Sequence, residues 1–314
     1  MKQTVYFTFL MLLAAFNGHS QSIQKGPYTV TELAAGVFHI EDANDSNPAG
    51  VTIGDDGQMT NMNNCSDMYL LTGSTKALLI DLSNEIKWDS TATESLRSIV
   101  YERSGNKELL ITVTHKHGDH LGMLPAFKND QKVTFWIPKK EFEGRDIFPS
   151  ERTHLFDENA SLDLGGGLVV NTMEVSGHTA HSTLFFLKGK NLVFTGDAIG
   201  SGNGVWLFNE ESFYTYKNSI DKLIAYIENP SNSVNIDKLQ IYGGHFWQGK
   251  QLGQLTSQYI YDMRTLINEI GKGTAKTEEM SAFIKFLDTN FKYGTATISW
   301  NKEAAERYSK GENQ

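Results

Sequence analysis

The chain has a single cysteine, Cys65, among its 314 residues, so it cannot form an intrachain disulfide. It contains no internal repeat, no low-complexity tract and no Lys/Arg cluster beyond Lys139 and Lys140. Positive charge is scarce, since the formal net charge is −9. A net acidic chain of this kind argues against a nucleic acid as the main partner. Its 39% hydrophobic and 21% charged residues fit an ordinary globular protein.

The apolar run nearest the N-terminus, residues 5–16, is too short to cross a bilayer as a helix. A lysine precedes it, and Gly18 and Ser20 put small residues at the −3 and −1 positions of a cut before Gln21. We expect residues 1–20 to be a secretory signal peptide, so that the mature protein is periplasmic or secreted and leaves the membrane. A retained anchor or a buried first strand is the alternative, and N-terminal sequencing of the exported protein tests it.

Apolar patterns and turn residues predict two sets of strands, each followed by helices. The first set covers residues 28–30, 37–40, 68–71, 77–80, 109–113 and 133–137, and the second covers residues 168–175, 183–187, 191–195 and 239–242. Helices are expected at residues 89–103, 121–128, 213–228, 257–270 and 278–288. This order indicates two sheets packed face to face with helices outside. The stretch 41–64 has no clear period and is expected to be a long loop, either a flap or plain surface.

A cluster of histidines follows the buried strand predicted at residues 109–113. Residues 115–120 read His-Lys-His-Gly-Asp-His, which places three imidazoles and a carboxylate within six residues. Imidazole and carboxylate are ligands that suit zinc and related metals, and Gly118 lets the backbone turn sharply at the strand end. A lone histidine in such a place is most often structural, but this spacing predicts a metal site.

Three more strand ends present a possible ligand beside glycine, namely His178, Asp197 and His245. With these residues the chain resembles the metallo-β-lactamase superfamily of metal-dependent hydrolases, from about residue 64 to residue 245 and through all five family blocks in order. The resemblance implies a four-layer αββα sandwich for residues 21–314. In that fold the metals lie at the edge where the strand ends converge.

The resemblance also implies how the ligands divide between two zinc ions per chain. One ion would be held by His115, His117 and His178, the other by Asp119, His120 and His245, and Asp197 would bridge them. Each ion keeps a position for water, as catalytic zinc does, and a metal-bound hydroxide would attack the substrate. Asp119 is the expected catalytic residue, because it can also orient the hydroxide or relay a proton. Asp81 matches a family position that braces the metal loop through a hydrogen bond.

Several residues of this chain differ from those that particular branches of the family carry, which reduces the number of activities to consider. Di-iron oxidoreductases of this fold carry Glu at the position of His117, which favours hydrolytic zinc chemistry here. True β-lactamases usually carry Cys or Ser at the position of Asp197, and acyl-homoserine lactonases carry Tyr at that of Gly200. His181 is also unusual for the family. We expect it to contact the substrate or donate a hydrogen bond near the metals, or else to pack beside its loop.

The substrate pocket is weakly specified by the sequence. Trp206 and Phe208 follow Asp197 in a glycine-rich stretch and are candidates for an apolar wall. Trp247 follows His245 and is a further candidate contact. Ordinary core packing is the alternative for each of these aromatic residues.

We therefore expect a di-zinc hydrolase that cleaves an ester, thioester, lactone or amide bond in a small-molecule substrate. A phosphodiesterase, a β-lactamase and a non-hydrolytic iron oxygenase of the same fold are the alternative activities. A purely structural or binding role is disfavoured because the full ligand set is intact. The sequence leaves open the substrate, the oligomeric state and the metal that is loaded in the cell.

Overall fold

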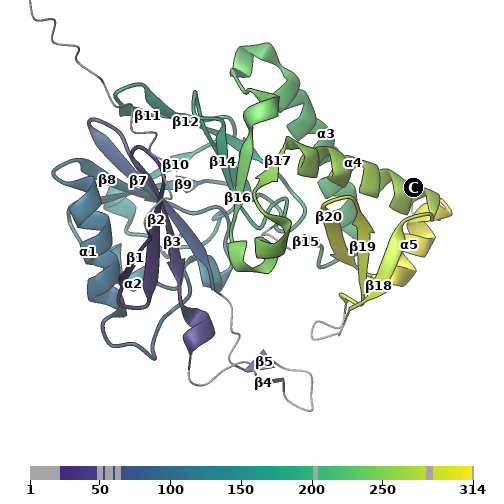
Figure 1. The fold of residues 1–314 in the computed structure, drawn as a ribbon, viewed down its shortest axis with the longest axis horizontal. Helices are drawn as coiled ribbons and strands as arrows, with labels where there is room; N and C mark the ends of the chain where they lie inside the picture. Colours follow the sequence, from purple (N-terminus) through teal and green to yellow (C-terminus); the bar gives the residue numbers. More distant parts are fainter. Residues whose placement is uncertain are drawn as a thin grey trace, which may run out of the picture.

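The computed structural model of the protein describes residues 22–47, 52–53, 59–60, 65–200, 204–280 and 286–312. The predicted signal peptide lies outside these ranges. Two large sheets pack face to face in the middle of the molecule, and helices cover the outer face of each sheet (Figure 1). Among the described residues, no helix is both long and apolar enough to span a bilayer.

The first sheet has eight strands. In order across the sheet these are β1 (Ser22–Lys25), β2 (Tyr28–Ala34), β3 (Val37–Asp42), β6 (Asp67–Thr72), β7 (Lys76–Ile80), β8 (Glu108–Thr112), β9 (Val133–Pro138) and β10 (Thr153–Phe156). Strands β7 to β10 run parallel to one another, so their C-terminal ends meet at one edge of the sheet. Asp81 follows β7, the histidine cluster follows β8, and Glu141 lies just beyond β9.

The second sheet has six strands. In order these are β11 (Ser161–Gly165), β12 (Leu168–Glu174), β13 (Thr183–Leu187), β14 (Leu192–Gly196), β16 (Gln240–Gly243) and β17 (Leu255–Thr256). Strands β14 and β16 are parallel, and β12 runs in the same direction because the antiparallel strand β13 separates it from β14. His178, Asp197 and His245, which follow β12, β14 and β16, therefore leave the sheet at the same edge.

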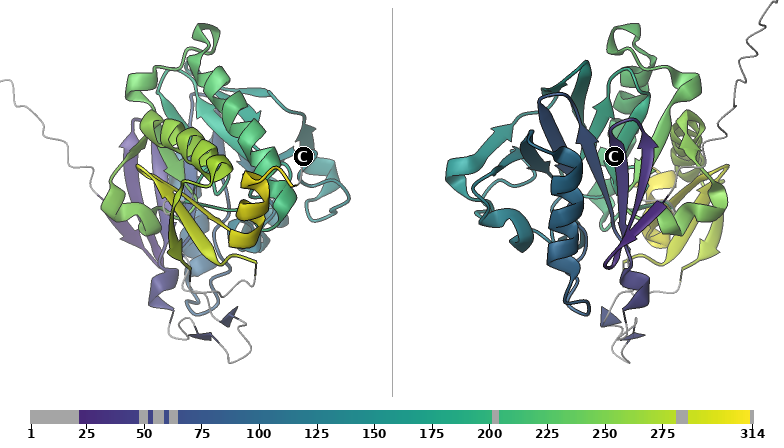
Figure 2. Two further views of the ribbon diagram at one scale, coloured as in Figure 1. Left: turned by 90° about the vertical axis from the view of Figure 1, so that its right-hand side faces the viewer. Right: turned by 60° about the vertical axis from the view of Figure 1, so that its left-hand side comes forward.

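The apolar core lies in three layers. Between the sheets, side chains such as Leu78 and Ile80 of β7 meet Phe185 and Phe194 of the second sheet, and all four are buried. Helices α1 (Ala92–Ser104) and α2 (Pro125–Lys128) cover the outer face of the first sheet, whereas α3 (Glu210–Glu228) and α4 (Ser257–Lys272) cover that of the second (Figure 2). This order of layers confirms the αββα sandwich that the sequence predicts.

Helix α3 illustrates how the local sequence sets these layers. Asn209 is its N-cap, and the Asn209 side chain accepts a hydrogen bond of 2.9 Å from the backbone N–H of Ser212. Its buried side chains recur at helical spacing and form one apolar face, which includes Phe213, Tyr216, Ile220, Leu223, Ile224 and Ile227. That face packs on the second sheet.

A third sheet, which the sequence does not predict, lies beyond α4 (Figure 1). Its order is β15 (Val205–Trp206), β20 (Ala296–Trp300), β19 (Thr289–Tyr293) and β18 (Lys276–Glu279), and helix α5 (Lys302–Ser309) packs beside it. The helix predicted at residues 278–288 is therefore wrong at its start, and residues 281–285 lie outside the described ranges. All of β18 is exposed, so burial leaves no period in its sequence, and pairing with β19 decides its conformation.

The remaining elements are short. Within the predicted loop at 41–64, strand β4 (Thr52–Ile53) pairs with β5 (Met59–Thr60). The 3₁₀ segments are η1 (Asn44–Ser46), η2 (Gly118–His120), η3 (Ser150–Arg152), η4 (Pro230–Asn232), η5 (Ile236–Lys238) and η6 (Phe246–Leu252). Of these, η2 carries part of the histidine cluster into the site.

Candidate metal centre

Four strand ends converge at one edge of the sandwich and bring seven side chains together. These are the residues that the sequence singles out as ligands: His115, His117, Asp119, His120, His178, Asp197 and His245. Their ligand atoms form overlapping groups of three, and the atoms of each group lie within 4.8 Å of one another. The loop after β8 supplies the local H-x-H-x-D-H set, whereas the other ligands arrive from strands far along the chain.

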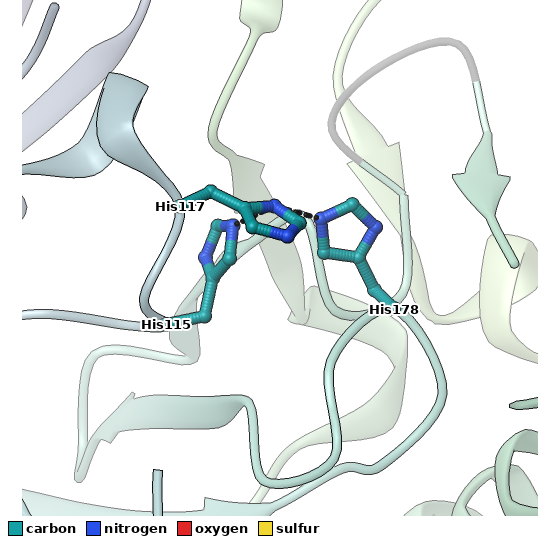
Figure 3. Close-up of side chains that lie close together, drawn as sticks. All are labelled: His115, His117 and His178. Carbon is teal, nitrogen blue, oxygen red and sulfur yellow. Dashed lines mark hydrogen bonds between the residues drawn. The ribbon is translucent and has the colours of Figure 1, made fainter. Parts of the chain in front are cut away.

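The first group consists of three imidazoles whose nitrogens point at one another (Figure 3). His117 Nδ1 lies 3.1 Å from His115 Nε2 and 3.0 Å from His178 Nε2. His115 and His117 come from the loop after β8, and His178 comes from the loop between β12 and β13. The group therefore forms only when the two sheets are packed together.

Hydrogen bonds on the far side of two of these rings determine which nitrogen is unprotonated. The Thr114 hydroxyl donates to Asp81 (2.9 Å), so the same oxygen accepts from His115 Nδ1 (3.0 Å). His178 Nδ1 donates to the carbonyl oxygen of Trp206 (3.1 Å). In the neutral tautomers that result, Nε2 of both rings carries a lone pair directed at the third ring.

If His117 Nδ1 carried a proton, it could donate to only one of the two Nε2 lone pairs that face it. A cation placed among the three nitrogens would accept all of their lone pairs. Burial lowers the pKa of the His115 imidazole well below its usual range, and neighbouring imidazoles lower it further. Burial also lowers the pKa of His178, and burial together with His178 lowers the pKa of His117 to about 4. Three neutral imidazoles with converging nitrogens are a donor set that suits zinc.

The second group combines two imidazoles with a carboxylate. His245 Nε2 lies 3.3 Å from Asp119 Oδ2. His120 Nδ1 donates to Asp81 (2.9 Å), and His245 Nδ1 donates to the carbonyl oxygen of Cys65 (2.7 Å). The Nε2 atoms of both rings therefore face the interior of the cluster.

Asp197 lies between the two groups. Its Oδ2 is 3.3 Å from His245 Nε2 and 3.6 Å from His178 Nε2, and its Oδ1 is 3.5 Å from His120 Nε2. Within the part of the chain that the structure describes, His120 Nε2 and Asp197 Oδ1 are buried and form no hydrogen bond, so their 3.5 Å ion pair is the contact between them. Buried polar atoms almost always form hydrogen bonds. These two atoms, with the lone pairs around them, fit a divalent cation.

Two backbone positions permit this close approach. A Cβ on Gly244 would lie 2.4 Å from Asp197 Oδ1 and 2.6 Å from His120 Cε1, so a larger residue would displace both side chains. Asp81 has a φ of 64°, in the left-handed region that short polar residues tolerate. From there its carboxylate reaches Thr114 and His120. These hydrogen bonds confirm the brace that the sequence predicts at Asp81.

The carboxylates change the acid–base chemistry of the second group. Burial opposes the charged form of His120, but Asp81, Asp197 and Asp119 outweigh it and raise the pKa of its imidazole well above the usual range. The same balance raises the pKa of His245, with Asp197 as the strongest neighbour. Burial opposes ionisation of Asp119, yet His120 and His245 hold its pKa below the usual range. Without a cation, the two imidazoles therefore supply the positive charge beside these carboxylates.

Two further groups form hydrogen bonds that hold the ligand loops in place, and the sequence gives little sign of either. Asp67, at the start of β6, accepts a hydrogen bond from the backbone N–H of Phe246 (2.5 Å) and pairs with His39 Nε2 (2.6 Å), which holds the loop of His245. An acidic residue at the start of an apolar strand is its one visible signal. The second is the Trp206 carbonyl, and no sequence pattern marks a backbone carbonyl.

The third sheet places this carbonyl and the aromatic residues around it. Trp206 lies opposite Ser299 of β20, and the N–H of Leu207 donates to the Ser299 carbonyl (3.0 Å). Since successive backbone groups of a strand point to opposite edges, the Trp206 carbonyl points away from β20, toward His178. Trp206 and Phe208 share one face of this segment, with ring centroids 6.3 Å apart.

The residues predicted to contact substrate lie in different settings. The half-buried Phe208 ring is 5.3 Å from the His178 ring and 5.8 Å from the His117 ring, so it borders the cluster. Trp247 is 37% exposed and donates its Nε1–H to the same Cys65 carbonyl that holds His245. Their contact with a substrate stays a prediction.

His181 lies on the loop of His178 but makes its own contacts. Its Nδ1 is 3.1 Å from Glu174 Oε1, and its backbone N–H donates to Glu141 (3.1 Å). The predicted role of His181 toward substrate also stays a prediction. The contacts place its ring beside β12.

Comparison with protein-family models matches residues 66–230, more than half of the chain, to the family described as the metallo-beta-lactamase superfamily. Of the seven clustered residues, His245 alone lies beyond the matched range. The match therefore covers both parts of the three-imidazole group and the bridging position.

Two curated proteins are similar in sequence. The Caenorhabditis elegans protein named "Beta-lactamase-like protein 2 homolog" is 24% identical over 220 residues, which cover 69% of this chain and 68% of that protein. The Bacillus subtilis protein named "Probable metallo-hydrolase YqgX" is 21% identical over 151 residues, which cover 44% of this chain and 67% of that protein.

Solved metallo-β-lactamase structures share the fold. One from Erythrobacter litoralis, with beta mercaptoethanol in its active site, superposes with a TM-score of 0.53 at 18% identity and covers 79% of this chain and 100% of its own. One from Pontibacter korlensis superposes with a TM-score of 0.55 at 16% identity and covers 77% of this chain and 99% of its own. At such identities the likeness shows the fold alone.

Proposed function

Because this chain belongs to the metallo-β-lactamase superfamily, we propose that it is a hydrolase that holds two zinc ions and cleaves an ester, thioester, lactone or amide bond of a small molecule. The observation that carries the proposal is the convergence of seven ligand side chains, in which the buried atoms His120 Nε2 and Asp197 Oδ1 form no hydrogen bond. Similarity to a protein named as a probable metallo-hydrolase supports the hydrolytic class.

The proposed division of labour follows from the geometry. One ion would bind the three imidazoles, the other would bind the second group, and Asp197 would contact both: the sets are His115, His117 and His178, and Asp119, His120 and His245. Bound divalent cations lower the pKa of water from ~15.7 to about 7 and polarise the bond to be cleaved. The carboxylate of Asp119 accepts a hydrogen bond from water and carries a proton to the leaving group. Burial raises the pKa of the Cys65 thiol to about 12, so this thiol is no nucleophile.

An apolar wall supports an acyl substrate over a phosphodiester. Phe208 borders the His117 and His178 rings from outside the cluster, and Trp206 lies beside it. An apolar part of the substrate would pack on this wall while its scissile bond faces the ligands. A phosphodiester would instead require Lys or Arg at the same place.

The test is a substrate panel run on zinc-reconstituted protein beside elemental analysis. We expect about two zinc equivalents per chain and turnover of a lactone, thioester, ester or amide. Turnover confined to a β-lactam or to a phosphodiester would replace the proposed substrate class. Iron as the dominant metal, with oxygen consumption on a thiol substrate, would overturn the hydrolase itself.

Export to a periplasm or the medium is a further part of the proposal and rests on residues 1–20 alone. A mature chain that still begins at Met1 would contradict it.

Metal uptake should depend on pH more steeply at the second group than at the first. The pKa values of His120 and His245 are raised, so protons occupy their Nε2 atoms in the metal-free protein and compete with the cation. The pKa of His117 is lowered to about 4, so the three imidazoles are neutral in mild acid. We expect zinc titrations to show two binding steps at about pH 8. As the pH falls to about 5.5, the step that belongs to the second group should be lost first.

The same shifts set the stability of the metal-free protein. The imidazole–carboxylate pairs of His120 and His245 stabilise the fold below the unfolded pKa of histidine, and this contribution is lost as the pH rises through the raised pKa. Metal binding should therefore raise the unfolding midpoint more at high pH than at low pH.

In the zinc titrations, an equal pH dependence of the two binding steps would contradict the assignment of the raised pKa values to the second group.

A further inference from the structure

Glu141 is a buried carboxylate, 2% exposed, in the turn that follows β9. Its Oε1 accepts a hydrogen bond from the backbone N–H of Lys116 (3.0 Å), and its Oε2 accepts one from the backbone N–H of His181 (3.1 Å). Both oxygens are thus used on backbone groups, and the two groups belong to different loops. One side chain of the first sheet therefore links two segments that are 65 residues apart by number.

The two linked loops are those that carry all three imidazoles of the first group. Lys116 stands between His115 and His117, and His181 stands three residues after His178. Figure 3 shows the three rings meeting across the gap between these loops. The spacing of the two loops sets the distance of 3.0 Å between His117 Nδ1 and His178 Nε2.

A backbone hydrogen bond also joins the same two loops, from the N–H of Thr183 to the carbonyl of Thr114 (2.8 Å). That bond lies at the sheet side of the site. Glu141 adds a second connection at Lys116 and His181, so the pair of contacts holds each loop at two points.

The buried charge of Glu141 also depends on its two backbone contacts. In the part of the chain that the structure describes, no Lys, Arg or His nitrogen forms an ion pair with it. A buried anion needs hydrogen bonds or an opposite charge to offset its loss of hydration. The two backbone N–H groups supply these hydrogen bonds.

We propose that Glu141 is a positioning residue that holds the loops of His115, His117 and His178 at the spacing a metal ion requires. The proposal rests on the proposed function, since it assumes that the three imidazoles bind metal. It acts through the loops and does not make Glu141 a ligand. It predicts that loss of Glu141 weakens one metal site and spares the other.

The test compares Glu141→Gln with Glu143→Gln by zinc titration against a chromophoric chelator. Gln keeps the shape of Glu, but its amide presents N–H groups to one of the two backbone donors, so one loop is released. Glu143 is exposed two residues further on, and its substitution removes the same charge. His117→Ala serves as the reference that identifies which binding step belongs to the three imidazoles.

We expect Glu141→Gln to weaken that step by about 10- to 100-fold, as loss of groups that orient metal ligands does. The other step should change less than about threefold, and Glu143→Gln should match the wild type. Equal weakening of both steps, with a lowered unfolding midpoint of the metal-free protein, would show a general structural role and overturn the proposal. So would a Glu141→Gln protein that binds zinc like the wild type.

If Glu141→Gln does not fold, Glu141→Asp takes its place. This variant keeps the charge, but its side chain is one methylene shorter and reaches only one loop, so the same step should weaken. A wild-type protein that binds no zinc would overturn the proposed function, and this inference with it. If the wild type binds zinc in two steps and the Glu141 variant that folds binds zinc with the same two affinities, only the role of Glu141 is overturned.

Discussion

Asp197→Asn should remove most of the metal from both sites and nearly all of the activity. The Asp197 carboxylate lies 3.3 to 3.6 Å from imidazole nitrogens of both groups. Asn keeps the size of the side chain but loses its charge and places an amide N–H group toward one side. Removal of one partner from a buried ionic contact costs about 3–5 kcal/mol. Metal affinity should therefore fall on the order of 10²- to 4 × 10³-fold at both steps.

The measurement is metal content and two-step zinc titration of the purified variant, beside its turnover. Asp146→Asn is the matched control, because Asp146 is exposed and lies outside the cluster. An Asp197→Asn protein that holds both ions at wild-type affinity would show that this carboxylate does not bridge them. Loss of a single step would assign Asp197 to one ion only.

Asp119→Asn should reduce kcat strongly while the three-imidazole site keeps its metal. Asp119 belongs to the second group only, and its side chain is 26% exposed, so it faces both the ligands and the solvent side. Its lowered pKa keeps the carboxylate ionised, so it can accept a hydrogen bond from water and orient it. Asn cannot take up a proton. Loss of a proton-transfer group typically lowers the rate about 10²–10⁴-fold.

The two aspartates should thus be distinguished by kcat measured beside metal content. For Asp119→Asn we expect the step assigned by His117→Ala to remain at wild-type affinity, with a weakened second step. Saturating zinc should restore occupancy of the second site without restoring kcat. Near-normal turnover with both ions bound would mean that Asp119 is a ligand and takes no part in proton transfer.

Much of the candidate site could be predicted from sequence because its pattern is local. The H-x-H-x-D-H spacing after a buried strand lies within one loop, and each other ligand stands beside glycine at a strand end. In a sandwich of this kind, strand ends that share a direction meet at one edge, so His178, Asp197 and His245 had to arrive together. The αββα order likewise follows from two runs of strands and helices.

Long-range pairing, by contrast, left no pattern to read. Strand β18 has every side chain exposed, and β15 has two residues, so neither shows a periodic burial pattern. Both exist because they pair with β19 and β20. The helix predicted at residues 278–288 failed at its start for this reason. The role of Glu141 was hidden as well, because its partners are backbone N–H groups that any residue would provide.

The sequence by itself thus determined which side chains meet, since ligand type, glycine and strand direction are local properties. Only the tertiary structure decided how they meet. The Trp206 and Cys65 carbonyls and the Asp81 carboxylate hold the outer nitrogens of the imidazoles and turn the inner ones toward the cluster. The Trp206 and Cys65 contacts join segments of separate sheets, and the Asp81 contact joins the ends of the paired strands β7 and β8. Their physical basis is hydrogen-bond geometry over a few ångströms, which exists only once the strands have paired and the sheets have packed.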